Sequence, residues 1–398
     1  MEIFLIPIVV TIVIVTLTLL HAFLGMRLNH MRNKMRWWRN VESIFKNQII
    51  LVFLLVLSIF FFQPKKEEPA YQNNLLENGE VRLYNLRQLT FSGENAEAYF
   101  SASGKQLVFQ SHDGDSLCDQ IYIMDIASGQ TKMVSTGFGV TTCSYFEYPE
   151  CDNIIYASTH MDNKACPEKP DYSRGYVWKL YPGYDVFMAD LNGKVVSQLT
   201  NSPGYDAEAT VAFDGSKIIY TSIISGDLEI WSMDKDGSNK KQLTNRLGYD
   251  GGAFFNVDAT KIVWRVYHPK TEKEIRDYRY LLSQNSIRPM ALQIWTMNAD
   301  GSNKTQVTDN GAANFGPYFF PDGNRIIFSS NLHDPKGRDF DLYAINVDGS
   351  NLERITYFDG FDGFPMFSPD GKYLVFASNR NQMKKGDTNL FIAEWRYN

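Results

Sequence analysis

The chain has 398 residues, of which 44% are hydrophobic and 14% are aromatic, and its formal net charge is −6. Residues 1–66 carry a surplus of six positive charges, so the remainder has a net charge of −12. A region this acidic lacks the positive surface that neutralises phosphates, which excludes nucleic acid as the expected partner. The length exceeds that of a usual single core, and the many short runs of Val, Ile, Thr and Tyr favour strands over helices.

Residues 1–63 predict a two-helix transmembrane anchor. No charged residue occurs from Ile3 to Met26, and this stretch is long enough to cross a membrane as a helix. A second apolar run, 48–63, is close to the lower limit for a span. The loop 27–47 between them contains six Lys or Arg and one Glu, which places the loop in the cytoplasm and both ends of the hairpin outside. A cleaved signal peptide is the alternative, but its positive charges precede the apolar core, whereas here only Glu2 does.

After a polar linker over 64–79, a three-part pattern recurs through residues 80–398. The first part is a turn followed by an apolar strand, as in AFDGSKIIY at 212, FPDGNRIIF at 320 and SPDGKYLVF at 368. The second part is an alternating strand that ends in another turn, as in LEIWSMDKDG at 228 and FDLYAINVDG at 340. The Asp-Gly pairs supply the positive φ that tight hairpins require, and the residues that follow are typical of buried strands.

The third part is a short strand that ends in a closing pair. The six closing pairs are Leu89-Thr90, Val134-Ser135, Leu199-Thr200, Leu243-Thr244, Val307-Thr308 and Ile355-Thr356. They follow one another at steps of 45, 65, 44, 64 and 48 residues, and strands that recur at about this period are typical of propeller blades. The sequence therefore predicts an all-β, six-bladed β-propeller over 80–398. Because the last unit stops after its third strand, we expect the lone strand 85–90 to complete that blade and close the ring.

These repeats resemble a known family. SPDGKYLVFASNR and FPDGNRIIFSSN, together with the Asp-Gly-Ser-Asn turns and the Leu-Thr closures, are similar to the repeats of TolB-type propellers, which are related to the WD-repeat group. The resemblance implies a six-bladed propeller outside the cytoplasm that is commonly used for protein contacts. It does not imply the Tol system itself, whose propeller is a soluble periplasmic protein with an additional small domain. With the membrane hairpin, the resemblance implies a location at the bacterial cytoplasmic membrane with the propeller in the periplasm.

Two blades are longer than the others by about twenty residues, and both excesses fall between the second and third strands. They span 159–183 and 268–292, and loops of this class share one rim of a propeller with the loops that join successive blades. The blade-to-blade loops read GYDAEA at 204, GYDGGA at 248 and DGFDGFP at 359, which would place carboxylates and aromatic rings around the channel mouth. The alternative is that these Asp residues hold the loops through backbone hydrogen bonds. The candidate binding residues of this rim are Tyr205, Asp206, Tyr249, Asp250, Phe361, Asp362, Tyr176, Trp178 and Tyr278.

Four cysteines in an extracytoplasmic protein permit disulfides. Cys118, Cys143 and Cys166 are all expected on the rim with the insertions, whereas Cys151 falls in a turn at the opposite face. One bridge among the first three is expected, most simply Cys118 to Cys143 or Cys143 to Cys166. Cys151 is expected to stay unpaired.

Histidines on the same rim are weak candidates for a metal site. His112, His160, His268 and His333 each follow a second strand, and with a thiolate they would suit a soft metal. No close-spaced pair such as His-x-x-x-His supports the assignment, so surface histidines are the alternative. The segment Asp234 to Asn239 resembles the start of a calcium loop, but its twelfth position is Asn245 instead of Glu, and a plain hairpin turn is preferred.

The sequence favours a non-enzymatic scaffold whose propeller binds a protein partner, with no cofactor. A two-helix hairpin, where a single helix would tether the domain, indicates packing against other transmembrane helices and hence an integral membrane complex as the partner. No Gly-x-Ser-x-Gly motif occurs. The alternatives are a metal-dependent lyase or lactonase that uses the channel mouth, and a sensor of an envelope ligand.

Overall fold

The structure is a computed structural model that describes residues 75–112, 118–168, 170, 172, 175–335 and 337–397. The predicted transmembrane hairpin and most of the predicted linker lie outside these residues. Within the described part of the chain, no helix has both the length and the apolar character needed to cross a membrane.

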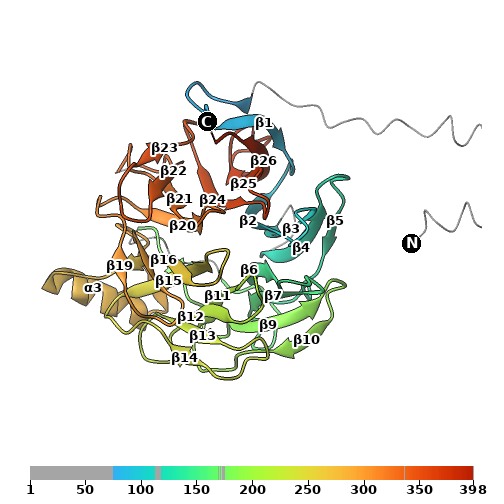
Figure 1. The fold of residues 1–398 in the computed structure, drawn as a ribbon. Coiled ribbons are helices and arrows are strands. Elements are labelled where there is room, and N and C mark those ends of the chain that lie inside the picture. The colour runs from blue at the N-terminus through green and yellow to red at the C-terminus, as the bar shows by residue number, and fades with distance from the viewer. Residues whose placement is uncertain are drawn as a thin grey trace, which may run out of the picture. The chain divides into compact units, whose positions relative to one another are not determined.

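The described chain folds into six four-stranded antiparallel sheets arranged around a central axis (Figure 1). The first blade contains β2 (Glu94–Phe100), β3 (Gln106–His112), β4 (Gln120–Asp125) and β5 (Thr131–Met133). The second contains β6 (Thr141–Phe146), β7 (Asn153–Ser158), β9 (Asp185–Asp190) and β10 (Val195–Gln198). The third contains β11 (Asp206–Val211), β12 (Ile218–Ser222), β13 (Glu229–Met233) and β14 (Lys241–Gln242). The next two are β15 (Tyr249–Phe255), β16 (Lys261–Tyr267), β18 (Gln293–Asn298) and β19 (Thr305–Gln306); and β20 (Asn314–Phe319), β21 (Arg325–Ser330), β22 (Asp341–Asn346) and β23 (Glu353–Arg354). The predicted all-β, six-bladed propeller is thus confirmed.

The sixth blade combines the two ends of the described chain. It contains β24 (Asp362–Phe367), β25 (Tyr373–Ser378) and β26 (Asn389–Trp395), and its outer strand is β1 (Leu83–Gln88). β1 pairs antiparallel with β26, with Leu83 opposite Trp395 and Gln88 opposite Phe391. A strand from before the first blade therefore closes the ring.

The closing Thr or Ser of each repeat has the same role in all six blades. Its hydroxyl accepts a hydrogen bond from the backbone N–H of the second residue of the third strand, as in Ile230 to Thr244 at 2.8 Å and Leu390 to Thr90 at 2.9 Å. The other four bonds join Ile121 to Ser135, Val186 to Thr200, Ile294 to Thr308 and Leu342 to Thr356. The outer strand has only two or three residues in most blades, so few backbone hydrogen bonds join it to the third strand. The side-chain bond of the closing residue adds a further link between these two strands.

The turns between first and second strands pack against the neighbouring blade. Gly215 in the AFDGSKIIY turn has φ of +70°, and a Cβ there would lie 2.7 Å from the carbonyl oxygen of Tyr148 in the preceding blade. Both the backbone conformation and the close approach therefore require glycine at this position. The two faces of the propeller differ in these connections. The hairpin face carries the turns within each sheet between strands one and two and between strands three and four, and the opposite face carries the remaining loops.

Candidate functional site

The two long insertions leave the blades on the face opposite the hairpin turns and contact each other. The first follows β7, and the second follows β16. The second insertion contains α3 (Glu272–Ser283), and Thr271 and Glu274 form a capping box at the start of this helix. A two-residue strand of the first, β8 (Trp178–Lys179), pairs antiparallel with β17 (Ser286–Ile287) of the second. The insertions belong to the second and fourth blades, so their pairing passes over the third. We refer to residues 159–183 and 268–292 together as the cap, and to this side of the propeller as the cap face.

A disulfide joins the cap to the first blade. Cys118, in the loop between β3 and β4, is bonded to Cys166 in the first insertion. This corrects the expected pairing, because both pairings favoured from the sequence used Cys143. The physical reason is that Cys143 lies at a bulge of the inner strand β6 with φ of +51°, where its backbone N–H is bonded to Gln110 at 3.1 Å. Cys151 and Cys143 both remain free thiols.

The first insertion also reaches the fifth blade, which lies across the ring from the second (Figure 1). The guanidinium of Arg338, in the loop between β21 and β22, lies 5.1 Å from the centre of the Tyr176 ring. Tyr172 stacks on Tyr176 with a centroid distance of 5.7 Å. Contacts from one insertion to the first, fourth and fifth blades place the cap over the channel mouth.

Beneath the cap lies a buried ion pair. Arg265 on β16 pairs with Glu208 on β11, and Tyr249 donates a hydrogen bond to the same carboxylate at 2.9 Å. Trp178 of the cap covers this group, because the Arg265 guanidinium lies 4.8 Å from the centre of the Trp178 rings. The side chains of Arg265 and Glu208 are each only 9% exposed. Removing one partner of a buried ion pair strongly destabilises a folded protein, because the other charge is left buried without its counter-ion. The pair therefore holds the third blade against the fourth.

Glu208 belongs to a set of six equivalent positions that line the channel. Each inner strand has a β-bulge, and the bulged residue has φ between +51° and +59°. The six residues are Glu97, Cys143, Glu208, Gly252, Gly316 and Phe364, and all of them line one cavity of about 20 Å³. A cavity of this size has room for about one water molecule. The channel is therefore filled with side chains at this level.

The channel residues have strongly perturbed acidities. Burial raises the pKa of Glu97 to about 7, against the opposing effect of Arg265. Burial also raises the pKa of the Cys143 thiol well above its usual value. Glu97, Glu208 and Arg265 were not predicted from the sequence. A signal was present for the first two, because each lies two positions after a buried polar residue near the start of its inner strand, as Glu97 follows Asn95 and Glu208 follows Asp206.

The three Asp residues predicted at the channel mouth lie at the starts of inner strands, and each is at most 1% exposed. Asp250 accepts hydrogen bonds from the indole N–H of Trp264 at 2.6 Å and lies 2.9 Å from His268 Nε2. Asp362 accepts from Arg380 at 2.7 Å. Burial raises the pKa of Asp206, and hydrogen bonds from the hydroxyls of nearby Ser and Thr residues partly offset this increase. These carboxylates therefore contact neighbouring strands and loops of the propeller.

The aromatic residues predicted beside them divide into two groups. Tyr205, Tyr249 and Tyr278 are at most 8% exposed and belong to a hydrophobic cluster beneath the cap. Tyr278 on α3 donates a hydrogen bond to the carbonyl of Gly248 at 2.6 Å, and it also bonds Asp227. Phe361 and Trp178 are partly buried against the same cluster, whereas Tyr176 is 48% exposed. Of the predicted rim residues, Tyr176 presents the most side-chain surface to a partner.

Of the four candidate metal-binding histidines, His268 faces Asp250, and no two of the four share a group of potential ligands within the described residues. His160 is 8% exposed, packs against Phe187 with ring centres 4.2 Å apart, and has a pKa that burial lowers. His112 bonds Asp119 through Nδ1 at 2.5 Å and faces Glu94 through Nε2 at 3.4 Å. Hydrogen bonds to Asp119 and Glu94 raise the pKa of His112 to about 10, so this imidazole is a cation near neutral pH.

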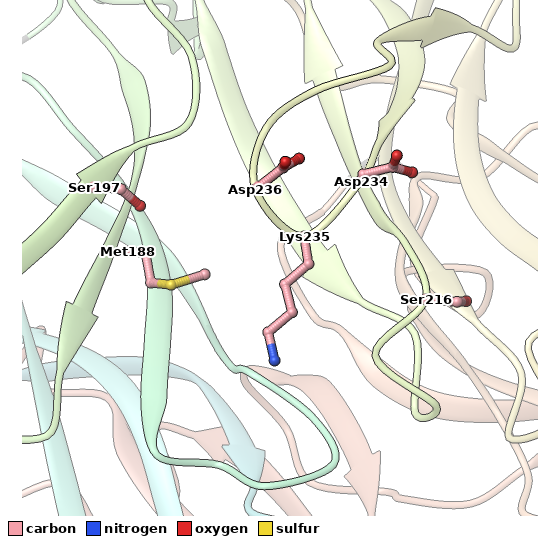
Figure 2. A pocket seen from close by; sticks show the side chains of 6 residues that line it. All are labelled: Met188, Ser197, Ser216, Asp234, Lys235 and Asp236. Atoms are coloured by element: carbon pink, nitrogen blue, oxygen red, sulfur yellow. The ribbon is translucent and has the colours of Figure 1, made fainter.

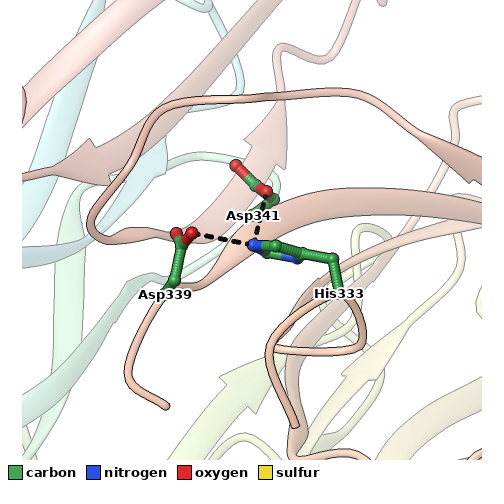
Figure 3. Close-up of side chains that lie close together, drawn as sticks. All are labelled: His333, Asp339 and Asp341. Carbon is green, nitrogen blue, oxygen red and sulfur yellow. Dashed lines mark ion pairs between the residues drawn. The ribbon is translucent and has the colours of Figure 1, made fainter.

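His333 differs, because it gathers two carboxylates around one nitrogen. Its Nε2 atom lies 3.0 Å from Asp339 Oδ2 and 3.3 Å from Asp341 Oδ2 (Figure 3). Within the described residues, this is the single group of three His, Cys, Asp or Glu side chains whose ligand atoms all lie within 4.8 Å of one another. His333 was a candidate ligand from the sequence, whereas neither carboxylate was predicted.

The hairpin face has an open hollow between the second and third blades. It has a volume of about 520 Å³ and is lined by Met188, Ser197, Ser216 and the turn Asp234–Asp236 (Figure 2). Figure 2 shows the Lys235 side chain pointing away from both carboxylates, toward the preceding blade. There its ammonium pairs with Glu147, and Glu150 lies 3.8 Å away. Asp234 is held by Lys217 and by Asn239 at 2.6 Å, so this segment is built as a hairpin turn.

Large apolar side chains are exposed mainly on the cap face. Of the eighteen that are exposed among the described residues, ten lie in the cap, in blade-to-blade loops or in loops between second and third strands. These ten are Phe91, Phe138, Met161, Tyr172, Tyr176, Ile224, Tyr280, Met290, Tyr357 and Met383. The other eight lie mostly in or beside outer strands. The cap face therefore carries more of the exposed large apolar side chains than the hairpin face and the outer strands together.

Comparison with known proteins identifies the kind of propeller. Residues 281–394 match the family model described as the TolB beta propeller domain. The repeats in this part of the chain are therefore similar to those of TolB-type propellers, and the described residues form a propeller with six blades. A protein described as TolB from Agrobacterium tumefaciens superposes with a TM-score of 0.52 at 19% identity, over 76% of this chain and 91% of that one. A gluconolactonase from Xanthomonas campestris gives a TM-score of 0.52 at 11% identity, over 81% and 94% of the two chains. At these identities the likeness shows the fold alone.

Proposed function

We propose that this chain is a non-enzymatic docking module, anchored in the bacterial cytoplasmic membrane, whose cap face binds a protein subunit of an integral membrane complex on the periplasmic side. The observation that carries the proposal is that ten of the eighteen exposed large apolar side chains among the described residues lie on this face, most of them Tyr, Phe and Met. Aromatic residues and Met are enriched at the centres of protein interfaces. The cations of Lys164 and Arg338 lie over two of these rings, Phe138 and Tyr176, so the surface combines apolar and positively charged groups.

Two further features support this assignment. The Cys118–Cys166 disulfide suits an oxidising compartment such as the periplasm. The apolar segments 3–26 and 48–63, with the basic loop between them, support a membrane hairpin whose two ends lie outside the cytoplasm.

A catalytic role at the channel mouth is less well supported. Trp178 and the rest of the cap lie over the mouth, and the cavity within the channel holds about 20 Å³. Pockets for small ligands are commonly of about 300 Å³ or more. The docking proposal therefore uses the outer surface of the cap face.

Mild-detergent purification of the full chain, followed by mass spectrometry of the co-purified proteins, tests the proposal. A triple variant, Met161→Ser, Tyr176→Ser and Met290→Ser, changes side chains that are 68%, 48% and 60% exposed, so the propeller should fold normally. We expect this variant to lose the partner. The matched control, Val196→Ser and Val257→Ser, changes residues away from the cap that are 55% and 47% exposed, and it should retain the partner. Equal retention by both variants would contradict the proposed docking face.

The location is tested separately by reporter fusions. A reporter that is active only outside the cytoplasm should be active when fused after Asn398 and inactive when inserted near Asn40. The opposite pattern would overturn the proposed orientation without bearing on the docking face.

A further inference from the structure

The strongest unassigned chemistry lies in the loop between β21 and β22, where His333, Asp339 and Asp341 converge (Figure 3). His333 is contributed by the start of the loop and the two carboxylates by its end. Figure 3 shows both carboxylates directed at the same nitrogen of the imidazole. The side chains of His333 and Asp339 are 19% and 23% exposed, and that of Asp341 is fully buried.

One imidazole nitrogen carries at most one proton, whereas His333 Nε2 faces two carboxylate oxygens at 3.0 and 3.3 Å. One proton cannot make two well-directed hydrogen bonds, so the imidazole does not satisfy both oxygens at once. Arg354 pairs with Asp341 Oδ2, whereas Asp339 Oδ2 faces the imidazole. His112 provides the contrast, because its two carboxylates face opposite nitrogens of the ring, each of which can donate one hydrogen bond. The arrangement at His112 is that of an ion pair, while the arrangement at His333 is that of a ligand set around a cation.

Surrounding hydrogen bonds hold all three groups in place. His333 Nδ1 lies 3.1 Å from the Tyr343 hydroxyl, which leaves Nε2 directed at the carboxylates. Asp339 Oδ1 accepts from the backbone N–H of Gly360 at 3.1 Å, and its Oδ2 faces the imidazole. Asp341 Oδ1 accepts from Thr356 at 3.2 Å, and its Oδ2 accepts from Arg354 Nε at 2.7 Å. Outer contacts of this kind orient the ligands of metal sites.

We propose that His333 Nε2, Asp339 Oδ2 and Asp341 Oδ2 form a binding site for a divalent transition-metal ion of the Zn²⁺ class. One imidazole and two carboxylates suit Zn²⁺, which commonly takes three protein ligands and completes its coordination with water. All ligand atoms already lie within 4.8 Å of one another, so small movements bring them to metal-ligand distances of about 2.0 to 2.2 Å. The ion takes the place of the imidazole proton and neutralises Asp339, while Arg354 continues to pair with Asp341.

The site has a structural consequence for the cap face. Arg338, which lies over Tyr176, belongs to the same loop and precedes Asp339 directly. A bound ion links the two ends of this loop and fixes the position from which Arg338 reaches the cap. The metal would therefore stabilise the contact between the fifth blade and the first insertion.

Zn²⁺ titration of the full chain in mild detergent, purified with a tag free of histidine and stripped with EDTA, tests the site. Calorimetry should show one ion per chain, and Zn²⁺ should raise the unfolding temperature. His333→Gln and Asp339→Asn should each weaken binding at least tenfold, about the effect of losing a contact in a metal site. His112→Gln is the matched control, because it removes a histidine that also lies between two carboxylates, and it should bind as the unchanged chain does.

A second control addresses the free thiols. Cys151→Ser should leave Zn²⁺ binding unchanged, which shows that binding does not depend on this partly buried thiol. The proposal is overturned if the unchanged chain binds neither Zn²⁺ nor Mn²⁺ at 100 µM, or if His333→Gln binds Zn²⁺ with unchanged affinity. Both outcomes are independent of whether the cap face retains a protein partner.

Discussion

The ring is held together in two regions of different character, the seam of the sixth blade and the cap over the channel mouth. At the seam, β1 continues a sheet and every blade has an equivalent outer strand. At the cap, a two-residue strand pair and one stacked Arg join blades that are not neighbours, and one disulfide joins the cap to the first blade. The seam is part of the repeat that makes the propeller, whereas the cap is an addition to it. We therefore expect damage to the seam to unfold the propeller, and damage to the cap to alter one face.

The largest effect is expected at the seam, from Arg380→Ala. The Arg380 guanidinium lies between Glu80 and Asp362 and also donates to the carbonyl of Leu75 at 2.9 Å. All three side chains are at most 2% exposed, so the substitution leaves two buried carboxylates without their cation. We expect a loss of about 3–5 kcal/mol in the free energy of unfolding, measured by chemical denaturation.

Lys372→Ala in the same blade is the control for Arg380→Ala. Lys372 pairs with Asp370 at 3.1 Å, but its side chain is 73% exposed, and exposed pairs contribute little. If Arg380→Ala costs no more than this control, the seam does not depend on the buried pair.

This comparison also shows what the sequence could predict. The six closing pairs recur in phase, so blade number and the place of the outer strand could be inferred from residues such as Leu243 and Thr244. Arg265 and Arg380 do not recur in the repeats, and in the sequence each is a single charged residue within or just after a predicted strand. Their partners lie far away in sequence, 57 residues for Glu208 and 300 for Glu80, and no periodic pattern joins them.

The candidate site was predicted in position but not in detail. Insertion lengths alone placed the long loops between β7 and β9 and between β16 and β18. The pairing of β8 with β17 could not be inferred, because two-residue strands have no detectable alternation. The disulfide was mispredicted because the sequence does not show that Cys143 occupies a bulge within the channel wall.

A smaller loss is expected when the cap is released from the first blade. The double variant Cys118→Ala and Cys166→Ala removes a crosslink that spans 48 residues, which typically stabilises a protein by about 2–4 kcal/mol. We expect the propeller to remain folded, and limited proteolysis to cut faster within 159–183. Cys151→Ala, which removes a free thiol on the hairpin face, should leave the proteolysis rate unchanged. Equal rates for the two variants would show that the disulfide does not hold the cap.

The smallest and most local effect is expected at the start of β13, where Glu229 occupies a position that Gln120 and Gln293 occupy in the first and fourth blades. Burial raises the pKa of Glu229 to about 8, with Asp250 and Asp227 adding to the shift and Thr244 and Lys304 opposing it. In the unfolded chain the carboxyl ionises near its usual value of 4.5. Between these two values the unfolded chain releases a proton that the folded chain retains, so stability falls as the pH rises.

Glu229→Gln removes this ionisation and introduces an amide that two other blades already accept. In the unchanged chain we expect the contribution of Glu229 to fall by on the order of 1–2 kcal/mol between pH 5 and pH 8. The variant should therefore equal the unchanged chain at pH 5 and exceed it in unfolding free energy at pH 8. Burial also raises the pKa of Asp185, in the second blade, to about 6. Asp185 therefore causes a similar loss of stability at lower pH, and the Glu229→Gln variant still shows that loss. Parallel stability curves for the two chains would mean that Glu229 is ionised in the folded propeller, and that the blade accommodates its charge at little cost.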